Sequence, residues 1–341
     1  MRTVSAVASP LRRLSPVAAR QGSRRCFSSS RDLQATWGFI GLGRMGYPMA
    51  RNLRAKIPAE DILFVQDVNT AASKKFLDEH PQGVRVAANV REVAEKAEVI
   101  ITSLPEPQHV KGVFKEMLEP ATLLTEGLNK ERLFIDCSTI DPMTSGEVAK
   151  AAQSSGQGTF IDAPMSGGVV GAQAGTLTFM IGAAPDKVER ATEVLSLIGK
   201  KVLHLGEQGA GLKGKLANNY LLALNNVATA EAMSMGIKWG LDPKALAGMI
   251  NISTGKCWPS EVNNPVPGVI PGSPASRGYE GGFGVSLANK DLKLALKAAA
   301  EADVKLALGE SARAIYDAAE KDENCKGKDF SVVYRYLGGK E

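Results

Sequence analysis

The sequence of 341 residues predicts an α/β fold, in which an N-terminal domain with a doubly wound parallel sheet is joined by a long helix to an all-α C-terminal domain. Three observations predict this fold. From residue 37 onward short apolar runs alternate with longer amphipathic segments, a glycine-rich turn follows the first run, and strand-like runs cease after Gly209. Alternation of strand and helix gives a parallel sheet covered by helices. We therefore expect a sheet domain at 36–205 and a helical domain at 206–338.

Seven apolar runs of strand length lie between residues 37 and 206. Segments with helical periodicity, at 46–56 and 70–80, separate the first three of them. We expect all seven runs to continue one sheet. They are WGFI (37–40), ILFVQ (62–66), EVIITSL (98–104), RLFIDCS (132–138), GTFIDA (158–163), TLTFMIG (176–182) and KVLHLG (201–206).

A long, largely buried helix is predicted from about Leu212 to Trp239, where Ala, Leu, Asn and Met dominate without strand-like alternation. Pro243 is typical of the first position of the next helix. The segment 255–286 is rich in Pro, Gly, Asn and Ser and should be irregular. Further helices are expected at 243–252, 288–302, 307–321 and 329–337.

The basic residues are concentrated at the N-terminus. Seven Arg and no Asp or Glu lie within residues 1–31, so the formal charge of +5 belongs to this segment and the rest of the chain carries a formal charge of about −2. Scattered Arg among Ser, Ala, Val and Leu is typical of a mitochondrial transit peptide, and predicts a protein of the mitochondrial matrix. The alternative is a disordered basic arm that contacts nucleic acid, but we expect no nucleic-acid partner.

Composition argues against several other classes of protein. The longest apolar runs are interrupted well before the ~18 residues that a membrane span requires, so we expect no membrane partner. The four Cys contain no CxxC pair, and the three His are far apart without an HExxH motif. We therefore expect no metal site and no histidine-based hydrolase.

GLGRMG at 41–46 places Gly at the first, third and sixth positions between an apolar strand and a helix. This context indicates a dinucleotide-binding Rossmann fold, in which the first Gly permits a tight turn, the second leaves room for a pyrophosphate and the third allows helix and strand to approach. The helix N-terminus attracts the phosphates. The predicted cofactor-binding residues here are Gly41, Leu42, Gly43, Arg44, Met45 and Gly46.

Asp67 ends the second predicted strand, where a carboxylate can accept hydrogen bonds from both hydroxyls of the adenine ribose and repel a 2′-phosphate. No Arg follows that could receive a 2′-phosphate. We therefore expect NAD rather than NADP. The alternative is that Asp67 is an ordinary helix cap.

Leu104, Pro105 and Thr139 follow later strands, at the carboxyl edge where ligands of such sheets bind. They are candidates to line the nicotinamide half of the site. The alternative is that Ser138, Thr139 and Asp141 simply cap a helix that begins near Pro142.

DAPMSGG at 162–168 presents a hydroxyl and two glycines after a strand, so that several N–H groups can converge on an anion. Ser166, Gly167 and Gly168 are therefore candidates to bind a substrate carboxylate. A plain glycine-rich turn is an equally good interpretation from local sequence.

Lys215 and Asn219 lie four residues apart at the start of the long helix, on one face. Oxidation of a hydroxyl group needs a base, and a lysine can serve if burial and the positive end of its helix lower its pKa. A helical lysine is ordinarily solvated, as expected for Lys213. Lys215 differs because it shares its face with the apolar Leu212 and Leu216.

Four motifs in the same order resemble the signatures of the β-hydroxyacid dehydrogenase family. They are GLGRMGYPMARNL (41–53), DAPMSGG, GxGxxxK (209–215) with Asn219, and ANKDL (288–292). The resemblance covers about 37–338. GKCWPSEVNNPVPG (255–268) and YEGGFG (279–284) are similar to the branch that acts on 3-hydroxyisobutyrate, more than to its tartronate semialdehyde or glyoxylate reductase relatives.

The resemblance implies NAD-dependent oxidation of 3-hydroxyisobutyrate to methylmalonate semialdehyde, a step of valine breakdown, by a homodimer or homotetramer. It implies that Lys215 is the acid/base, that Ser166, Gly167 and Gly168 bind the substrate carboxylate, and that Asn219 orients the substrate. It also implies that Lys290 contacts the cofactor side of the cleft, and that His109, in a loop, contacts the cofactor.

The sequence departs from the family pattern at three places. Lys213 and Gly214 stand where relatives carry small residues, which suggests that the helix begins later, and Met165 replaces the commoner Val. Alternative functions are another β-hydroxyacid dehydrogenase, acting on 3-hydroxypropionate, L-serine or tartronate semialdehyde, or a nucleotide-binding module without catalysis. A 6-phosphogluconate-type enzyme is disfavoured because only 50 residues follow Asp291, which is short for the large C-terminal domain of that relative.

Overall fold

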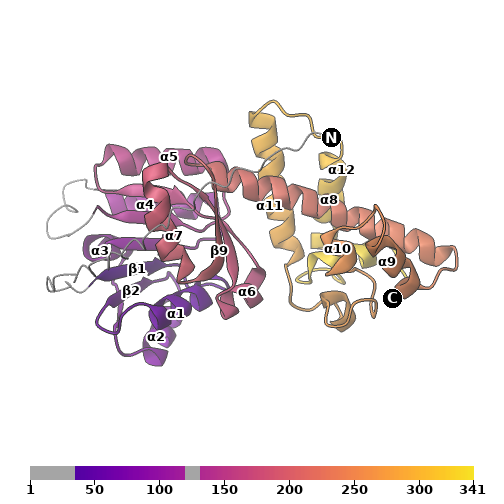
Figure 1. Ribbon diagram of the computed structural model, residues 1–341, viewed down its shortest axis with the longest axis horizontal. Coiled ribbons are helices and arrows are strands. Elements are labelled where there is room, and N and C mark those ends of the chain that lie inside the picture. The colour runs from indigo at the N-terminus through magenta and orange to yellow at the C-terminus, as the bar shows by residue number, and fades with distance from the viewer. Residues whose placement is uncertain (1–34, 120–130) are drawn as a thin grey trace, which may run out of the picture. The chain divides into compact units, whose positions relative to one another are not determined.

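The computed structural model describes residues 35–119 and 131–341. The expected transit peptide at 1–31 lies outside the described residues. The predicted fold class is confirmed, because a mostly parallel sheet with helices on both faces is followed by a helical domain (Figure 1).

The sheet has the strand order β3-β2-β1-β4-β5-β6-β8-β7, with β9 paired to β8. Strands β1 to β6 pair in parallel, and their register places Ile40, Gln66, Thr102, Asp136 and Asp162 in a row at the carboxyl edge. The described strands are β1 (Thr36–Ile40), β2 (Ile62–Gln66), β3 (Val84–Val86), β4 (Val99–Thr102), β5 (Leu133–Asp136), β6 (Thr159–Asp162), β7 (Met165–Ser166), β8 (Leu177–Gly182) and β9 (Gly199–Gly206).

The direction of β8 corrects the expectation of a fully parallel sheet. β8 runs antiparallel to β6 and to the short strand β7, and β9 then pairs with β8 in parallel. β7 continues in the direction of β6, because Met165 and Ser166 pair with Phe179 and Thr178 in the same antiparallel register in which Asp162 pairs with Gly182. The chain turns back only after β7, through α6 (Gly168–Ala174). A crossover that would keep β8 parallel to β6 is therefore not made.

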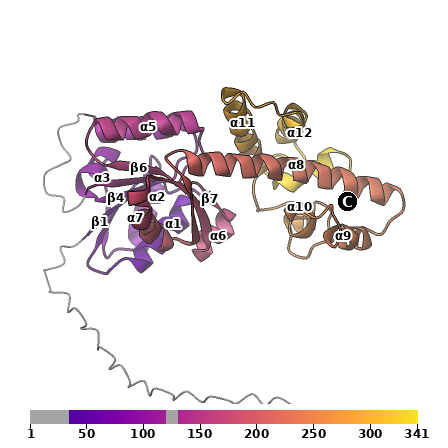
Figure 2. The ribbon, with the colours of Figure 1, turned by 45° about the horizontal axis from the view of Figure 1, so that its top comes forward.

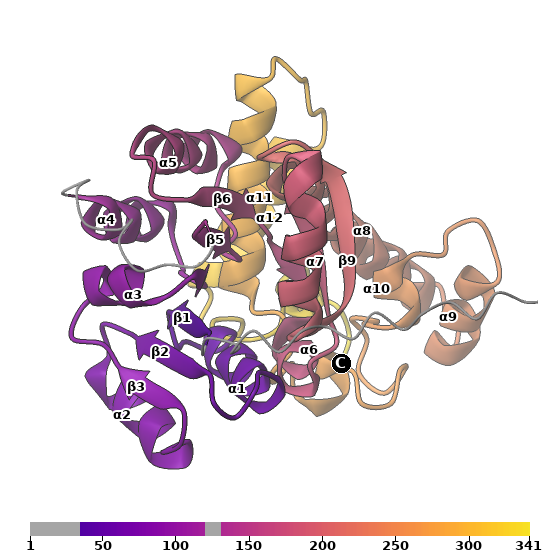
Figure 3. The ribbon, with the colours of Figure 1, turned by 60° about the vertical axis from the view of Figure 1, so that its left-hand side comes forward.

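Two apolar layers cover the sheet. One packs α1, α2, α6 and α7 against one face and contains Phe39, Leu53 and Phe76. The other packs α3, α4 and α5 against the opposite face (Figure 3) and contains Phe114 and Phe134. These helices are α1 (Gly46–Lys56), α2 (Thr70–Glu79), α3 (Val90–Lys96), α4 (Pro107–Leu118), α5 (Pro142–Ser154), α6 (Gly168–Ala174) and α7 (Val188–Ser196), with a 3₁₀ turn at Pro185–Lys187.

Helix α8 (Ala210–Lys238) connects the sheet to the helical domain (Figure 2). Its 29 residues span about 43 Å at a rise of about 1.5 Å per residue. Leu212 near its start packs in the second sheet layer, whereas Val227 and Met233 pack in clusters of the helical domain. The remaining helices are α9 (Pro243–Asn251), α10 (Trp258–Glu261), α11 (Val285–Glu301), α12 (Gly309–Lys321) and α13 (Val333–Tyr336), with 3₁₀ turns at Pro274–Arg277 and Phe330–Val332. Among the described helices, none is long and apolar enough to cross a membrane.

Candidate active site

The glycine-rich loop leaves space where a dinucleotide pyrophosphate would lie. Gly41 has a positive φ of 95°, and a side chain there would collide with the carbonyl of Ser103, while one at Gly46 would collide with the carbonyl of Gly41. A Cβ on Gly43, in contrast, would meet no described atom within 4 Å. No described side chain caps the N-terminus of α1, and its first turn carries no acid. The loop therefore fits the phosphates of a dinucleotide.

Asp67 joins the end of β2 to this loop. Its Oδ2 accepts a hydrogen bond from the Leu42 N–H at 2.6 Å, and its Oδ1 accepts one from the Asn69 N–H at 2.7 Å. Asn69 caps α2 by accepting from the Ala71 N–H, so the alternative in which Asp67 caps this helix is not what the structure contains. Each oxygen of Asp67 retains a lone pair that can accept from a ribose hydroxyl.

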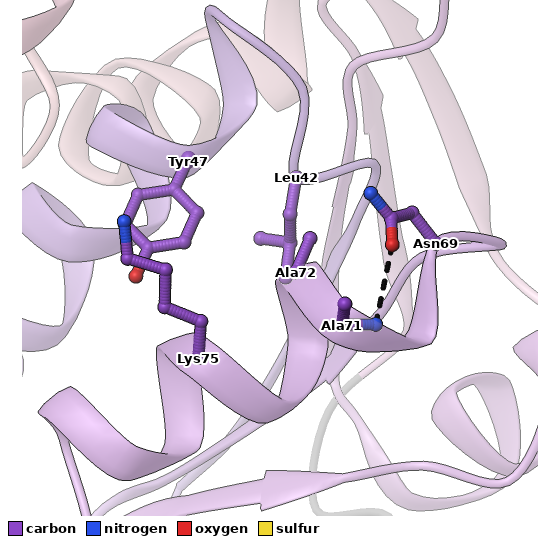
Figure 4. Close-up of a pocket in the computed structure, with 6 residues that line it drawn as sticks. All are labelled: Leu42, Tyr47, Asn69, Ala71, Ala72 and Lys75. Atoms are coloured by element: carbon purple, nitrogen blue, oxygen red, sulfur yellow. Dashed lines mark hydrogen bonds between the residues drawn. The ribbon is translucent and has the colours of Figure 1, made fainter.

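A hollow of about 380 Å³ opens beside Asn69 and is lined by side chains from the glycine-rich loop, α1 and α2 (Figure 4). The sequence reasoning missed Lys75, whose ammonium lies 5.5 Å from the centre of the Tyr47 ring. Burial and a hydrogen bond to Glu79 raise the pKa of Tyr47 to about 12. The lining residues are Leu42, Tyr47, Asn69, Ala71, Ala72 and Lys75.

The loops after β4 and β5 are held by a buried carboxylate that the sequence reasoning also missed. Oδ1 of Asp136 accepts from the hydroxyls of Thr102 at 2.7 Å and Ser138 at 2.6 Å. The Leu104 N–H in turn donates to Ser138 Oγ at 2.8 Å. Burial raises the pKa of Asp136. Asp141, rather than Ser138, caps α5 through the Thr144 N–H.

Lys290 links the helical domain to these loops. It lies on α11, and its Nζ donates to the carbonyl oxygens of Thr139 at 2.9 Å and Pro105 at 3.2 Å. These two residues were predicted to line the nicotinamide half of the site. His109, expected in a loop, is instead an exposed residue in the first turn of α4.

Lys215 and Asn219 lie one turn apart on α8, with exposed fractions of 8% and 5%. Burial lowers the pKa of Lys215, while Asp291 raises it and Lys290 lowers it. Nδ2 of Asn219 donates to Oδ2 of Asp291 on α11 at 2.6 Å. The structure thus brings together the two helical residues predicted from sequence, and adds Asp291, which the sequence reasoning did not assign.

The start of α8 is fixed by Asp162, the last residue of β6. Its Oδ1 accepts from the Gly209 N–H at 2.5 Å and its Oδ2 from the Leu212 N–H at 2.9 Å. The helix begins at Ala210, so the expectation that it begins later because of Lys213 and Gly214 is wrong. Gly214 is suited to this helix because a side chain there would collide with that of Leu205 on β9.

Ser166, Gly167 and Gly168 are exposed at the junction of β7 and α6. No hydrogen bond in the described part of the chain joins them to Lys215 or Asn219. The strand β7 and the start of α8 both contact β8: Ser166 pairs with Thr178, and the N-terminal turn of α8 packs against the carbonyl of Met180. Met165 is half-buried and packs in the first sheet layer.

The fold and these contacts define a class, the dinucleotide-binding oxidoreductases with a helical second domain. Two family models match the chain: residues 36–206 match the NAD binding domain of 6-phosphogluconate dehydrogenase, and residues 209–337 match the NAD-binding domain of NADP-dependent 3-hydroxyisobutyrate dehydrogenase. The chain belongs to the 3-hydroxyisobutyrate dehydrogenase family.

Individual relatives agree with this assignment. The mitochondrial 3-hydroxyisobutyrate dehydrogenase of Mus musculus is 44% identical over 305 residues, which cover 89% of this chain and 87% of the relative. A probable mitochondrial 3-hydroxyisobutyrate dehydrogenase of Dictyostelium discoideum is 43% identical over 310 residues, which cover 89% of this chain and 90% of the relative. The solved structure of Mycobacterium tuberculosis 3-hydroxyisobutyrate dehydrogenase with L-serine has a TM-score of 0.81 and 36% identity, covering 89% of this chain and 99% of that one. The expected NAD cofactor is therefore confirmed at the level of the family's NAD-binding domains.

Proposed function

We propose that this chain oxidises 3-hydroxyisobutyrate to methylmalonate semialdehyde with NAD, as a step of valine breakdown. The observation that carries the proposal is the buried Lys215 at the start of α8. Burial lowers the pKa of this lysine, and Lys215 lies one turn from Asn219. A lysine in this state can take the hydroxyl proton at Nζ. The sequences related over nine-tenths of the chain bear the name of this activity.

Each of the other predicted site residues would take one role in this reaction. Bound NAD would accept the hydride from the carbon that carries the hydroxyl. The loop at 41–46 would hold its pyrophosphate, Asp67 its adenine ribose, and Leu104, Pro105, Thr139 and His109 would lie toward the nicotinamide. Ser166, Gly167 and Gly168 would bind the substrate carboxylate, and Asn219 would orient the substrate. Lys290 supports the cofactor side through the Thr139 and Pro105 carbonyls.

The assay is NADH formation by the purified full-length chain across a panel of short hydroxy acids, with NAD and NADP compared. We expect the highest kcat/KM with 3-hydroxyisobutyrate and NAD. Lys215→Ala should lower kcat by about 100-fold or more, because general acid–base catalysis contributes that much, while the exposed Lys213→Ala serves as the control. Normal turnover by Lys215→Ala would overturn the mechanism, and a non-catalytic nucleotide-binding module would form no NADH with any acid.

L-Serine is the second candidate substrate, because the related Mycobacterium tuberculosis structure contains it. It shares with 3-hydroxyisobutyrate a primary hydroxyl on the carbon next to the one that bears the carboxylate. A higher kcat/KM for oxidation of L-serine or 3-hydroxypropionate, or for NADH-dependent reduction of tartronate semialdehyde, than for oxidation of 3-hydroxyisobutyrate would reassign the substrate within the family.

We also propose that residues 1–31 direct the chain to the mitochondrial matrix, and that 36–205 and 206–338 form the cofactor and substrate domains. The Arg-rich composition supports the first proposal, as do relatives named as mitochondrial. A fusion of residues 1–31 to a fluorescent protein should enter isolated mitochondria and become protected from protease. An unprotected fusion would contradict this localisation.

A homodimer or homotetramer is the assembly that we propose. The helical domain exposes large apolar side chains, with 72% of Trp239 and 88% of Ile252 exposed, together with Leu241, Met249 and Trp258. Contiguous exposed apolar patches are typical of an interface, and four of these side chains lie within the 14 residues from Trp239 to Ile252, at the end of α8 and along α9. Light scattering of the purified chain should give a mass of two or four chains, and the mass of one chain would contradict the proposal.

A further inference from the structure

We propose that Asp291 is a positioning residue for the oxidation, because its carboxylate fixes the orientation of the Asn219 amide and holds Lys290 beside it. The inference rests on the function proposed above. Asp291 is buried on α11, with an exposed fraction of 4%. It is 72 residues away from Asn219 in sequence, and its Oδ2 is 2.6 Å from Asn219 Nδ2.

The hydrogen bond decides which way the Asn219 amide faces. An ionised carboxylate can only accept, so Asn219 must turn its NH₂ group toward Asp291. Asn219 Oδ1 accepts from Asn218 Nδ2 at 3.1 Å, which reinforces the same orientation. The second hydrogen on Nδ2 remains available, so Asn219 would meet the substrate as a donor to one of its oxygen atoms.

The same carboxylate connects the two sides of the site. Its Oδ1 lies 3.6 Å from Nζ of Lys290, which donates to the carbonyl oxygens of Thr139 and Pro105. Asp291 thus touches both the group that would orient the substrate and the group that holds the loops toward the nicotinamide. A carboxylate in this place sets the distance between α8 and those loops.

Asp291 also acts on Lys215 through its charge. The charged groups that act on Lys215 are Asp291, which raises its pKa, and Lys290, which lowers it, and both lie on α11. Without the carboxylate, the burial of Lys215 and the Lys290 charge would both favour the neutral amine. The midpoint of the pH profile of kcat therefore reports whether the Asp291 carboxylate acts on Lys215.

The test compares three variants of the full-length chain in NADH formation from 3-hydroxyisobutyrate between pH 6 and 10. Asp291→Asn should shift the midpoint of the kcat profile to lower pH, and raise KM for the hydroxy acid by roughly tenfold or more, the effect of losing a hydrogen bond to a charged group. Asp291→Glu keeps the charge but moves it by one methylene, so it should retain the midpoint and lower kcat.

Asp317→Asn is the matched control. Asp317 accepts from another amide, Asn289 Nδ2, at 2.8 Å between α11 and α12, and pairs with Lys293. The Asp317→Asn variant should leave the midpoint of the kcat profile unchanged. A shift as large as that of Asp291→Asn would overturn the proposal, because general loosening of α11 would then explain both.

The outcomes separate the two proposals. Normal wild-type turnover combined with a wild-type pH profile and KM in Asp291→Asn would overturn the positioning role alone. A wild-type chain that forms no NADH would overturn the proposed function and this inference with it. If Asp291→Asn does not fold, Asp291→Glu still decides, since an undiminished kcat in that variant contradicts positioning.

Discussion

Oδ2 of Asp162, at the end of β6, accepts a hydrogen bond from the backbone N–H of Leu212, in the first turn of α8, at 2.9 Å. Oδ1 accepts from the Gly209 N–H at the same helix start. The carboxylate is fully buried and satisfies two N–H groups that a helix start leaves without partners. The position of Lys215, one turn further along, therefore follows from a residue of the sheet rather than from the helix sequence alone.

Asp162→Ala should destabilise the chain by about 1–3 kcal/mol at pH 8, because two buried donors lose their acceptors. Chemical denaturation measures the free energy of unfolding. The control is Asp186→Ala, which changes a carboxylate that is mostly exposed. Equal stability of wild type and Asp162→Ala would contradict the capping role.

The stability difference between wild type and Asp162→Ala should also depend on pH. Burial raises the pKa of Asp162 to about 6 from its usual 3.8, so the folded chain binds this proton more tightly than the unfolded chain does. The stability that comes from this proton is fully present below 3.8 and is lost as the pH rises through 6. The advantage of wild type over the variant should therefore grow on acidification from about pH 6, and an advantage that shrinks would contradict the raised pKa.

The structure confirms the sequence predictions of local structure, whereas the roles predicted for the site residues stay predictions. The strand–turn–helix context of the loop at 41–46, and the four-residue spacing of Lys215 and Asn219, each lie within one segment. Asp162 and Asp291 were not assigned, because their partners lie 50 and 72 residues away and only the folded chain brings them together.

The direction of β8 could not be predicted for a related reason. The apolar pattern of a buried strand does not indicate whether the strand is parallel or antiparallel to its neighbour. The direction of β8 depends on how the chain turns between β6 and β8. The chain turns back after the two-residue strand β7, through the seven-residue helix α6, and elements this short give no detectable periodicity. The start of α8 was misplaced because the helix-breaking tendency of Gly214 is local, whereas the cap from Asp162 is not.

A pair of glycine variants tests the cofactor loop. Gly43→Ala adds a methyl group that meets no described atom within 4 Å, so stability should change by less than about 0.5 kcal/mol. The methyl would occupy the space of the pyrophosphate, so we expect NADH binding, followed by fluorescence titration, to weaken by roughly tenfold or more. Gly46→Ala is the comparison, since it collides with the Gly41 carbonyl and should destabilise the fold itself. Unchanged NADH affinity in Gly43→Ala would contradict the placement of the pyrophosphate.

Asp67→Ala should lower the ratio of kcat/KM for NAD to that for NADP by roughly tenfold or more, because it removes a carboxylate that repels a 2′-phosphate. The bonds of Asp67 to the Leu42 and Asn69 N–H groups add a second expectation. The loop loses an anchor, so KM for NAD should rise as well. Glu79→Gln is the control, because Glu79 is a carboxylate that accepts a hydrogen bond from Tyr47, a residue that lines the hollow of Figure 4. A variant with the wild-type cofactor ratio would remove Asp67 from cofactor selection.

The pH dependence of turnover tests the state of Lys215 directly. Oxidation needs the neutral amine as a base, so kcat should rise with pH with a midpoint below 10.5, the usual pKa of lysine, because burial lowers the pKa of this group. The reverse reduction of the semialdehyde needs the ammonium, so its rate should fall over the same range. Lys213→Ala, at an exposed position two residues earlier, should leave both profiles unchanged. Kinetics in both directions give the two midpoints, and an oxidation midpoint at or above pH 10.5 would contradict a buried Lys215 as the base.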